Sequence, residues 1–324
     1  MKRVHIILSL VFILASIAGC GPSLPEGLVG EIAYISPVDD DGAHDIYILK
    51  LPSMEERRIT KTAGNNVENV WIDWSTTGLL AYGSNREASR DYEIFIVDAK
   101  GKYEEQLTKN DHFDGYPTFS PSGKLLAYSS ERPLEDSDER PQRDIYVADL
   151  KTGGEDRVTE TPGSELDLSW SPDGSRIAFS KSVMGFFQIF VYEIQTEETI
   201  QLTDVSGSNN RSPEWTPDAQ RIVFTSNRDD TENAGIKRRN SIYIMNADGS
   251  EQKGLLKDDI LSYNGPEVSP DGKWLLYSVV ATDWPEGENI MLRALDSEDG
   301  KNYKIMKNEY FNRTGTWNPL GVTK

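Results

Sequence analysis

A four-part pattern recurs along the chain about every 45 to 53 residues, and this repeat restricts the possible folds more than any other feature. Each copy starts with a turn that resembles Trp-Ser-Pro-Asp-Gly. The six copies begin at Trp74, Phe119, Trp170, Trp215, Val268 and Trp317. Repeats of this length are typical of propellers and other arrays, because a single unit cannot bury its apolar face alone.

Each unit also contains four short predicted strands. One strand ends at the turn, and for the turn at Trp170 the next three contain Ile177-Ala178-Phe179, Gln188-Ile189-Phe190 and Leu202-Thr203. The strand after each turn is apolar on both faces, as expected when another sheet covers either side. Six units of four strands predict an all-β fold, a six-bladed β-propeller of four-stranded antiparallel blades.

The order of the elements is circularly shifted. The chain enters the propeller at a second strand, Ile32-Ala33-Tyr34, and leaves it at Trp317, which belongs to the first strand of the same blade. We therefore expect residues 30–324 to form one ring that is closed by the C-terminal strand pairing in blade one. Closure pairs sheet edges that would otherwise be free to aggregate.

The aspartates of the repeated turn need no catalytic explanation. Pro presets the first corner of such a turn, Asp tolerates the second, and Gly supplies the positive φ at which the chain re-enters the sheet. We interpret Asp173, Asp218 and Asp271 as turn formers.

The N-terminus resembles a lipoprotein signal. Lys2 and Arg3 precede an apolar run that is too short to cross a bilayer as a helix, which is typical of a signal peptide. The run ends in Ile17-Ala18-Gly19-Cys20, which resembles a bacterial lipobox, and Cys20 is the single cysteine of the chain. We predict a signal peptide over residues 1–19, lipidation of Cys20 and a spacer over residues 20–29. The alternative is that Cys20 is a small buried hydrophobic residue.

Charge and cysteine content exclude several classes of partner. The net charge is −19, and removal of Lys2 and Arg3 with the signal would make it −21. Such a charge repels nucleic acid and anionic lipid headgroups, so membrane attachment has to come from acyl chains. A single cysteine allows no intramolecular disulfide, and the fold must be held by core packing. We expect a monomeric propeller without a cofactor.

The repeats resemble those of the TolB-like propeller family, over nearly all of residues 30–324. The family's Ser-x-Arg element is matched by Ser84-Asn85-Arg86, Ser130-Glu131-Arg132 and Ser226-Asn227-Arg228, whereas Ser180-Lys181-Ser182 and Ser278-Val279-Val280 depart from it. The lipobox-like N-terminus, and not this resemblance, predicts an exported, membrane-anchored lipoprotein of the bacterial cell envelope, on the periplasmic side of the outer membrane or on the outer cell surface. Related propellers are fused to serine peptidases, but the sequence contains no Gly-x-Ser-x-Gly motif, so we expect no peptidase activity.

The two faces of the predicted disc differ in their loops. The first-to-second and third-to-fourth strand turns are tight and share one face, the tight-turn face. The second-to-third connections and the blade crossovers share the other, the long-loop face, and include residues 131–143, 227–240 and 279–288. Since binding residues usually lie on loops that a rigid scaffold positions, we expect function on the long-loop face.

Polar and aromatic residues precede each innermost strand on that face and should surround the mouth of the axial channel. The ligand-binding candidates are Asp114, Tyr116, Asp167, Arg211, Asn264 and Arg313. Their aromatic, amide and charged groups suit a polar ligand such as a peptide or a glycan. The alternative is that they only line a water-filled channel.

Apolar residues at two loop tips are candidates for a protein interface. They are Phe186, Phe187 and Trp284, of the kind that anchors protein partners. The alternative is that they cover blade edges as part of the core.

These features favour a binding or scaffolding lipoprotein that engages an envelope protein, peptide or glycan. The alternative is a carbohydrate-active enzyme that uses Asp114, Glu165 and Asp167, for which glycoside hydrolysis needs carboxylates about 5 to 10 Å apart. Asp39-Asp40-Asp41 could suggest calcium, but Lys50 stands where an EF-hand loop has its final Glu, and the mature chain has only His44 and His112. We predict neither a metal site nor a catalytic residue.

Overall fold

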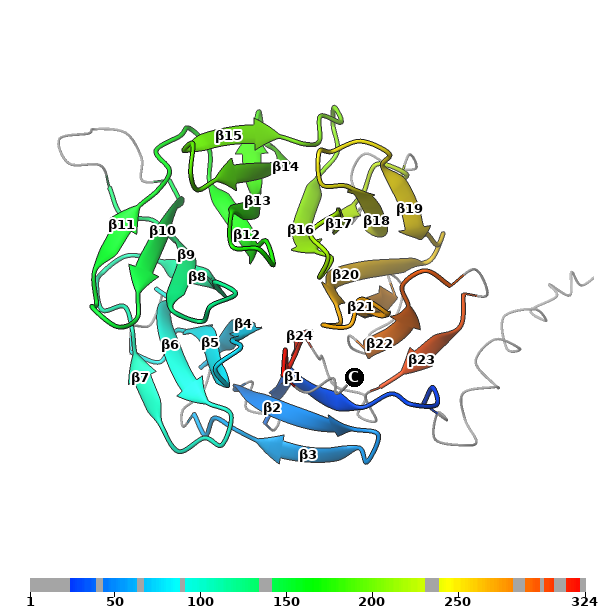
Figure 1. Ribbon diagram of the computed structural model, residues 1–324, viewed down its shortest axis with the longest axis horizontal. Coiled ribbons are helices and arrows are strands. Elements are labelled where there is room, and N and C mark those ends of the chain that lie inside the picture. The colour runs from blue at the N-terminus through cyan, green and yellow to red at the C-terminus, as the bar shows by residue number, and fades with distance from the viewer. Residues whose placement is uncertain are drawn as a thin grey trace, which may run out of the picture.

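The computed structural model describes residues 24–38, 43–62, 67–87, 91–133, 142–230, 239–281, 289–297, 300–305 and 313–320. These residues form 24 strands in six four-stranded antiparallel sheets, which surround a central axis like the blades of a propeller (Figure 1). The predicted all-β fold and the number of blades are confirmed. Within the described ranges, no helix has the length and apolar character to cross a membrane.

Five blades each use four strands that are consecutive in the sequence. Blade 2 contains β4 (Asn69–Trp74), β5 (Leu79–Ser84), β6 (Glu93–Asp98) and β7 (Glu104–Gln106), and blade 3 contains β8 (Asp114–Phe119), β9 (Leu125–Ser130), β10 (Asp144–Asp149) and β11 (Glu155–Arg157). Blade 4 contains β12 (Glu165–Trp170), β13 (Arg176–Val183), β14 (Phe186–Glu193) and β15 (Glu198–Gln201). Blade 5 contains β16 (Asn210–Trp215), β17 (Arg221–Ser226), β18 (Ser241–Asn246) and β19 (Lys253–Leu256). Blade 6 contains β20 (Leu261–Val268), β21 (Trp274–Ala281), β22 (Asn289–Ala294) and β23 (Asn302–Lys304).

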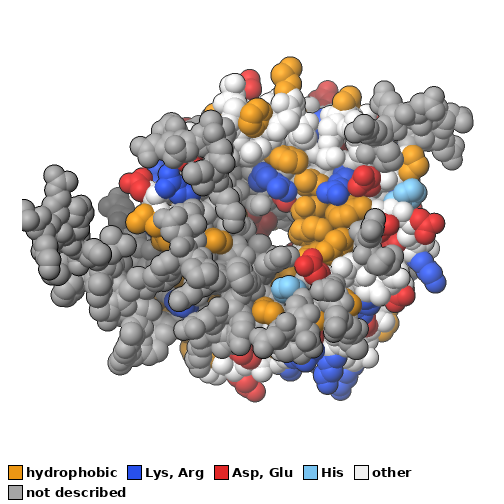
Figure 2. Space-filling view, turned by 180° about the vertical axis from the view of Figure 1, so that it is seen from behind, with side chains coloured by type: hydrophobic (Ala, Val, Ile, Leu, Met, Phe, Trp, Pro, Cys, Tyr) orange, Lys and Arg blue, Asp and Glu red, His pale blue; other side chains and the backbone are white. Residues whose placement is uncertain are grey.

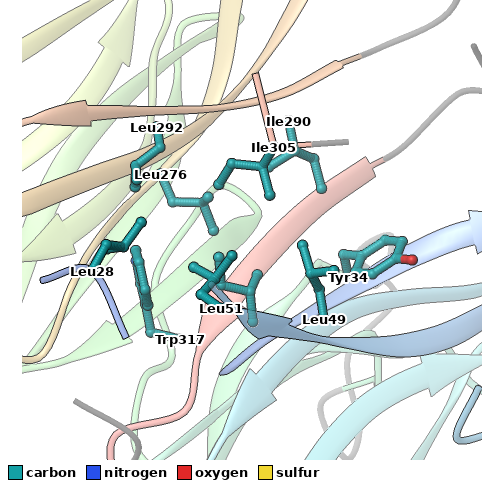
Figure 3. Packing of buried hydrophobic residues seen from close by; sticks show 10 residues of the cluster. Leu28, Tyr34, Leu49, Leu51, Leu276, Ile290, Leu292, Ile305 and Trp317 are labelled. Atoms are coloured by element: carbon teal, nitrogen blue, oxygen red, sulfur yellow. The ribbon is translucent and has the colours of Figure 1, made fainter. Parts of the chain in front are cut away.

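Blade 1 joins the two ends of the described chain. It consists of β24 (Arg313–Trp317), β1 (Gly30–Pro37), β2 (His44–Leu51) and β3 (Glu55–Arg58), in that order from the axis outward. In the β24–β1 pair, Trp317 lies opposite Ile32. The side chain of Trp317 lies in one apolar cluster with Leu51 of blade 1 and Leu276 of blade 6 (Figure 3). The predicted closure of the ring by the C-terminal strand is confirmed.

The repeated turn is held by its own side chains. In blade 4, the Ser171 hydroxyl donates to Asp173 Oδ1 over 2.5 Å, the same oxygen accepts the N–H of Ser175, and Gly174 has a φ of 72°. These hydrogen bonds lower the pKa of Asp173 to about 2. Asp218 and Asp271 bond the hydroxyls of Thr216 and Ser269 in the same way. All three aspartates are accounted for by turn structure.

Two further repeated elements form buried polar networks, namely the threonine of the Leu-Thr pair in blades 1 to 4 and the Ser-x-Arg element in blades 2, 3 and 5. In blade 4, the Thr203 hydroxyl accepts the N–H of Ile189 and donates to Gln188, and in blades 1, 2 and 3 Thr60, Thr108 and Thr159 accept the corresponding N–H. The arginine of the Ser-x-Arg element completes the network. In blade 5, Arg228 donates to Ser226 over 2.9 Å and to Asn210 over 2.8 Å. These motif residues therefore stabilise the blades by satisfying buried polar groups.

The innermost strands of blades 2 to 6 share an irregularity. Their pairing with the second strand shifts within each strand, for example between Val70 and Asp73, as in a β-bulge. One residue at each shift has positive φ, namely Trp71, Tyr116, Asp167, Ser212 and Gly265, with φ between 52° and 54°. Positive φ is uncommon for residues other than glycine, and bulges are often used to redirect a side chain beside a functional site.

Candidate functional site

The bulges direct side chains to the channel mouth on the long-loop face. Trp71 in blade 2 and Tyr116 in blade 3 occupy equivalent bulge positions, and their ring centroids lie 4.3 Å apart across the boundary between the blades. Neither ring is fully buried. The redirected side chains of neighbouring blades therefore meet at the mouth instead of packing inside the sheets.

Two more rings extend this contact into an aromatic platform, which consists of Trp71, Tyr92, Phe113 and Tyr116. The centroid of Trp71 lies 5.0 Å from that of Tyr92 and 5.5 Å from that of Phe113, both in edge-to-face geometry. Tyr92 and Phe113 come from the segments just before β6 and β8, and both remain partly exposed. Figure 2 shows hydrophobic side chains gathered beside the central opening, with basic side chains at their border.

Two glycines make room for the platform. A Cβ on Gly83 would stand 2.9 Å from Cε3 of Trp71, and a Cβ on Gly115 would stand 2.6 Å from Cζ of Phe113. In blades 3 to 6, the position equivalent to Gly83 is held by Ser129, Ser180, Thr225 and Ser278. These hydroxyls bond the innermost strand, as when Ser180 donates to Asp167 over 2.9 Å. Blade 2 lacks that hydroxyl and accommodates an indole ring instead.

Arginines border the platform on two sides. The guanidinium carbon of Arg143 lies 3.8 Å from the ring centroid of Phe113, and its Nε donates to Glu131 over 3.3 Å. Arg211 makes two hydrogen bonds to Asp167, of 2.9 and 3.3 Å, and its guanidinium lies 4.6 Å from the ring centroid of Phe187. The border thus carries charged donors, each paired with a carboxylate.

Three of the predicted mouth residues, Tyr116, Asp167 and Arg211, meet at this site. Burial raises the pKa of the Tyr116 phenol, and the nearby charge of Arg211 lowers it by a smaller amount. Tyr116 belongs to the platform and Arg211 connects it to Asp167. Asn264 is half-buried and accepts a hydrogen bond from Asn240 over 2.8 Å. For Arg313 the structure describes only the backbone, in β24, so ligand binding by its side chain stays a prediction.

Asp114 does not lie at the mouth, and neither does Glu165 from the enzyme alternative. Both side chains are fully buried. Asp114 accepts from Asn110 over 2.7 Å and pairs with Arg132, while Glu165 accepts from Thr161 and pairs with Lys181. Both stand at the start of the innermost strand, before the bulge, where their partners come from the same blade and from the crossover that precedes it. The prediction that Asp114 binds a ligand at the mouth is therefore corrected.

Of the three residues predicted to form a protein interface, Phe186 and Phe187 lie in the described part of the structure. Phe186 and Phe187 begin β14 and are half-buried, and Phe187 lies against Arg211 at the border of the platform. The exposed residue of that hairpin is Met184, at 97 % of its accessible surface. Trp284, Cys20 and the acidic run 39–41 lie outside the described residues.

Sequence reasoning missed Tyr92, Phe113 and Arg143 altogether. They belong to loops, where no periodic pattern marks a residue that will pack against another blade. The available signal was Gly83, which replaces the Ser or Thr of the next four blades.

A layer of carboxylates lines the channel below the mouth. Asp73 accepts the N–H of Phe119 over 2.6 Å, Glu214 accepts from Ser169 over 2.8 Å, and Glu267 accepts from Thr316 over 2.9 Å. Each of these bonds connects two neighbouring blades. Desolvation raises the pKa of Asp73 to about 6, and desolvation and mutual repulsion raise the pKa values of Glu214 and Glu267. Among the described side chains, no three potential ligands are grouped to hold a metal ion.

Comparisons with known proteins agree with this architecture. Over residues 136–323, the chain matches the family model described as the TolB beta propeller domain. It is 29 % identical over 191 residues to the Tol-Pal system protein TolB of Francisella tularensis subsp. mediasiatica. The aligned region covers 58 % of this chain and 40 % of that protein. It is 27 % identical over 190 residues to the uncharacterized protein Atu1656 of Agrobacterium fabrum, covering 57 % of this chain and 60 % of that protein.

Solved structures share the fold at lower identity. The TolB structure from Acinetobacter baumannii superposes with a TM-score of 0.64 and 20 % identity, over 89 % of this chain and 66 % of that one. The hydrazine synthase of Kuenenia stuttgartiensis gives a TM-score of 0.69 at 14 % identity, over 91 % and 47 % of the two chains. Identities this low show the fold alone, and the chain spans at most 60 % of the curated relatives it matches. Because the family model matches more than half of its length, the chain belongs to the TolB β-propeller family.

Proposed function

We propose that this protein is an exported lipoprotein that binds a protein partner in the cell envelope through its aromatic platform. The observation that carries the proposal is the contact of Trp71, Tyr92, Phe113 and Tyr116 at the channel mouth, bordered by Arg143 and Arg211. Trp, Tyr and Arg are the residue types most enriched at the energetic centres of protein interfaces.

The shape of the platform supports a protein as the ligand. Its rings contact one another and all four residues remain partly exposed, so they form a surface. Small-molecule sites are usually concave and bury most of their ligand, whereas protein partners cover surfaces. The relationship to TolB proteins, one of them named for the Tol-Pal system, supports a role in the cell envelope.

Two of the three residues that the enzyme alternative requires do not lie at the mouth. It requires Asp114, Glu165 and Asp167 together at the mouth, but Asp114 and Glu165 are fully buried and hydrogen-bonded to residues of the preceding crossovers. Asp167 is at the mouth, and its carboxylate is bound by Arg211. This set therefore offers no pair of free carboxylates for acid and base catalysis.

The proposal is tested by capturing partners with the detergent-solubilised full-length protein and measuring the affinity of the captured protein. The test variant combines Trp71→Ala with Tyr116→Ala. The control is Tyr103→Ala, because Tyr103 is an aromatic residue that is 49 % exposed in a turn of the opposite face. Loss of one central interface residue costs about 2 kcal/mol or more, which is a factor of about 30, so the double variant should weaken binding by more than about 30-fold.

The outcomes separate the alternatives. The Tyr103 variant should bind like the wild type, and circular dichroism should show that both variants remain folded. Equal affinity for all three proteins would refute the platform as the binding site. Capture that is abolished when the envelope extract is treated with glycosidases would indicate a glycan ligand, and turnover of a polysaccharide would favour the enzyme alternative.

A further inference from the structure

The segment that precedes the first strand is fixed to the propeller. Leu28 is only 4 % exposed and packs in the same apolar cluster as Trp317 (Figure 3). The partly buried side chain of Leu24 packs against this cluster. The N–H of Leu28 donates to the carbonyl of Pro25 over 3.2 Å, and Gly27 forms the corner with a φ of 79°. The chain is therefore already held to the folded domain at Leu24, six residues before β1.

This segment lies on the tight-turn face, at the boundary of blades 1 and 6. β1 begins at Gly30, opposite Leu51, which leads into the β2–β3 turn, and it ends at Pro37, opposite His44 on the long-loop side. The residues that cover Leu28 come from both blades, since the cluster contains Leu51 of blade 1 and Leu276 and Leu292 of blade 6. The position of the segment relative to the two faces is thus set by packing.

Covalent geometry then limits the distance from Cys20 to the propeller. Four residue steps separate Cys20 from Leu24, which span at most about 14 Å. The eight residues of β1 cross the disc and cover about 25 Å from one face to the other. The long-loop face therefore lies farther from Cys20 than the tether can reach.

We infer that the docked segment Leu24–Val29 orients the propeller on the membrane, with the tight-turn face of blades 1 and 6 toward the bilayer and the aromatic platform directed away from it. This inference rests on the proposed lipid anchor at Cys20. The net charge of −19 gives no electrostatic attraction to anionic lipids, so the orientation comes from the short tether and its packing. The platform is thereby presented to partners that are not embedded in the same leaflet.

The test uses two single-cysteine labels in the full-length lipidated protein. Cys20 is the only natural cysteine, and its thiol is consumed by acylation, so one introduced cysteine is labelled uniquely. Ser53→Cys places a fluorophore on an exposed residue of the β2–β3 turn, and Met184→Cys places it at the exposed tip of the β13–β14 hairpin on the long-loop face. Vesicles of neutral phosphatidylcholine contain a lipid with a nitroxide headgroup, which quenches only nearby fluorophores.

We expect several-fold stronger quenching at position 53 than at position 184. A flexible Gly-Ser insertion between Ser23 and Leu24 should remove most of this difference, because it lengthens the tether without disturbing the packing of Leu28. Flotation of the protein with the vesicles is measured first. Failure to float would refute the anchor and the orientation together, whereas stable flotation with equal or reversed quenching would refute the orientation alone.

Discussion

The indole of Trp71 occupies the space that a side chain on Gly83 would need, because a Cβ there would stand 2.9 Å from Cε3 of the ring. Gly83 pairs with Val70 across the β4–β5 pair of blade 2, and Trp71 is the next residue, in the bulge. The next four blades carry Ser or Thr at the position of Gly83 and have no indole at the bulge. One missing side chain in the second strand thus allows a large ring at the channel mouth.

Gly83→Ser should displace Trp71 and weaken partner binding. The added atoms overlap the ring, and overpacking of this kind costs about 1–3 kcal/mol, which a propeller of normal stability survives. We expect a folded protein with an altered near-ultraviolet circular dichroism spectrum and reduced affinity for the partner. Gly154→Ser is the matched control, since a Cβ on Gly154 meets no atom closer than 3.4 Å. Unchanged spectrum and affinity in the Gly83 variant would show that Trp71 tolerates the added group.

The axial carboxylates predict a stability that falls as the pH rises. Burial raises the pKa of Asp73 from 3.8 to about 6, and the pKa values of Glu214 and Glu267 are raised as well. The folded protein therefore holds more protons than the unfolded chain above about pH 4, and this stabilisation is lost as the pH rises through the folded pKa values. The turn aspartates act in a separate window, since the pKa of Asp173 is lowered to about 2 and its contribution disappears only in acid.

The measurement is urea unfolding at pH 5 and pH 8. Glu267→Gln should raise the free energy of unfolding at pH 8 by about 1–3 kcal/mol, because the amide keeps an acceptor for Thr316 and cannot ionise. It should change stability little at pH 5. Equal effects of the substitution at both pH values would mean that Glu267 does not carry the raised pKa.

Trp317→Ala should destabilise the ring at its closure. Trp317 is 3 % exposed and packs against blades 1 and 6, and truncation of a buried aromatic residue costs about 3–5 kcal/mol against a total of about 5–15. Leu320→Ala is the control, because Leu320 is 61 % exposed just beyond the strand. Calorimetry should show a marked fall of the melting temperature for the first variant only. Identical melting of the two variants would contradict a closing role for Trp317.

Cys20→Ser should release the protein from membranes. The thiol is the predicted acyl acceptor, and the negative net charge offers no alternative attachment to anionic lipids. Fractionation at high salt should find the wild type with the membranes and the variant in the soluble fraction. A variant that still sediments quantitatively with membranes would show that Cys20 is not the anchor.

The sequence by itself determined the architecture, because its signals are local and repeated. The Ser-Pro-Asp-Gly-like turn and the apolar strand act over a few residues and recur six times, and the Leu-Thr pair supports them in four units. These signals predicted the blades, the closure at Trp317 and the structural role of Asp173. The position of Tyr116, Asp167 and Arg211 beside the start of the innermost strands also predicted that they lie near the axis, and in the structure Arg211 bonds Asp167 there.

Only the tertiary structure decided which side chains meet at the mouth. Asp114 and Tyr116 are two residues apart, and by strand alternation they should share a face, yet Asp114 is fully buried in its blade while the bulge turns Tyr116 onto Trp71. Tyr92, Phe113 and Arg143 reach the same place from separate loops. A bulge changes the direction of a side chain through the pairing of two whole strands. Contacts between loops depend on how the ring brings neighbouring blades together. Because both effects involve segments that are far apart in the chain, no short stretch of sequence encodes them.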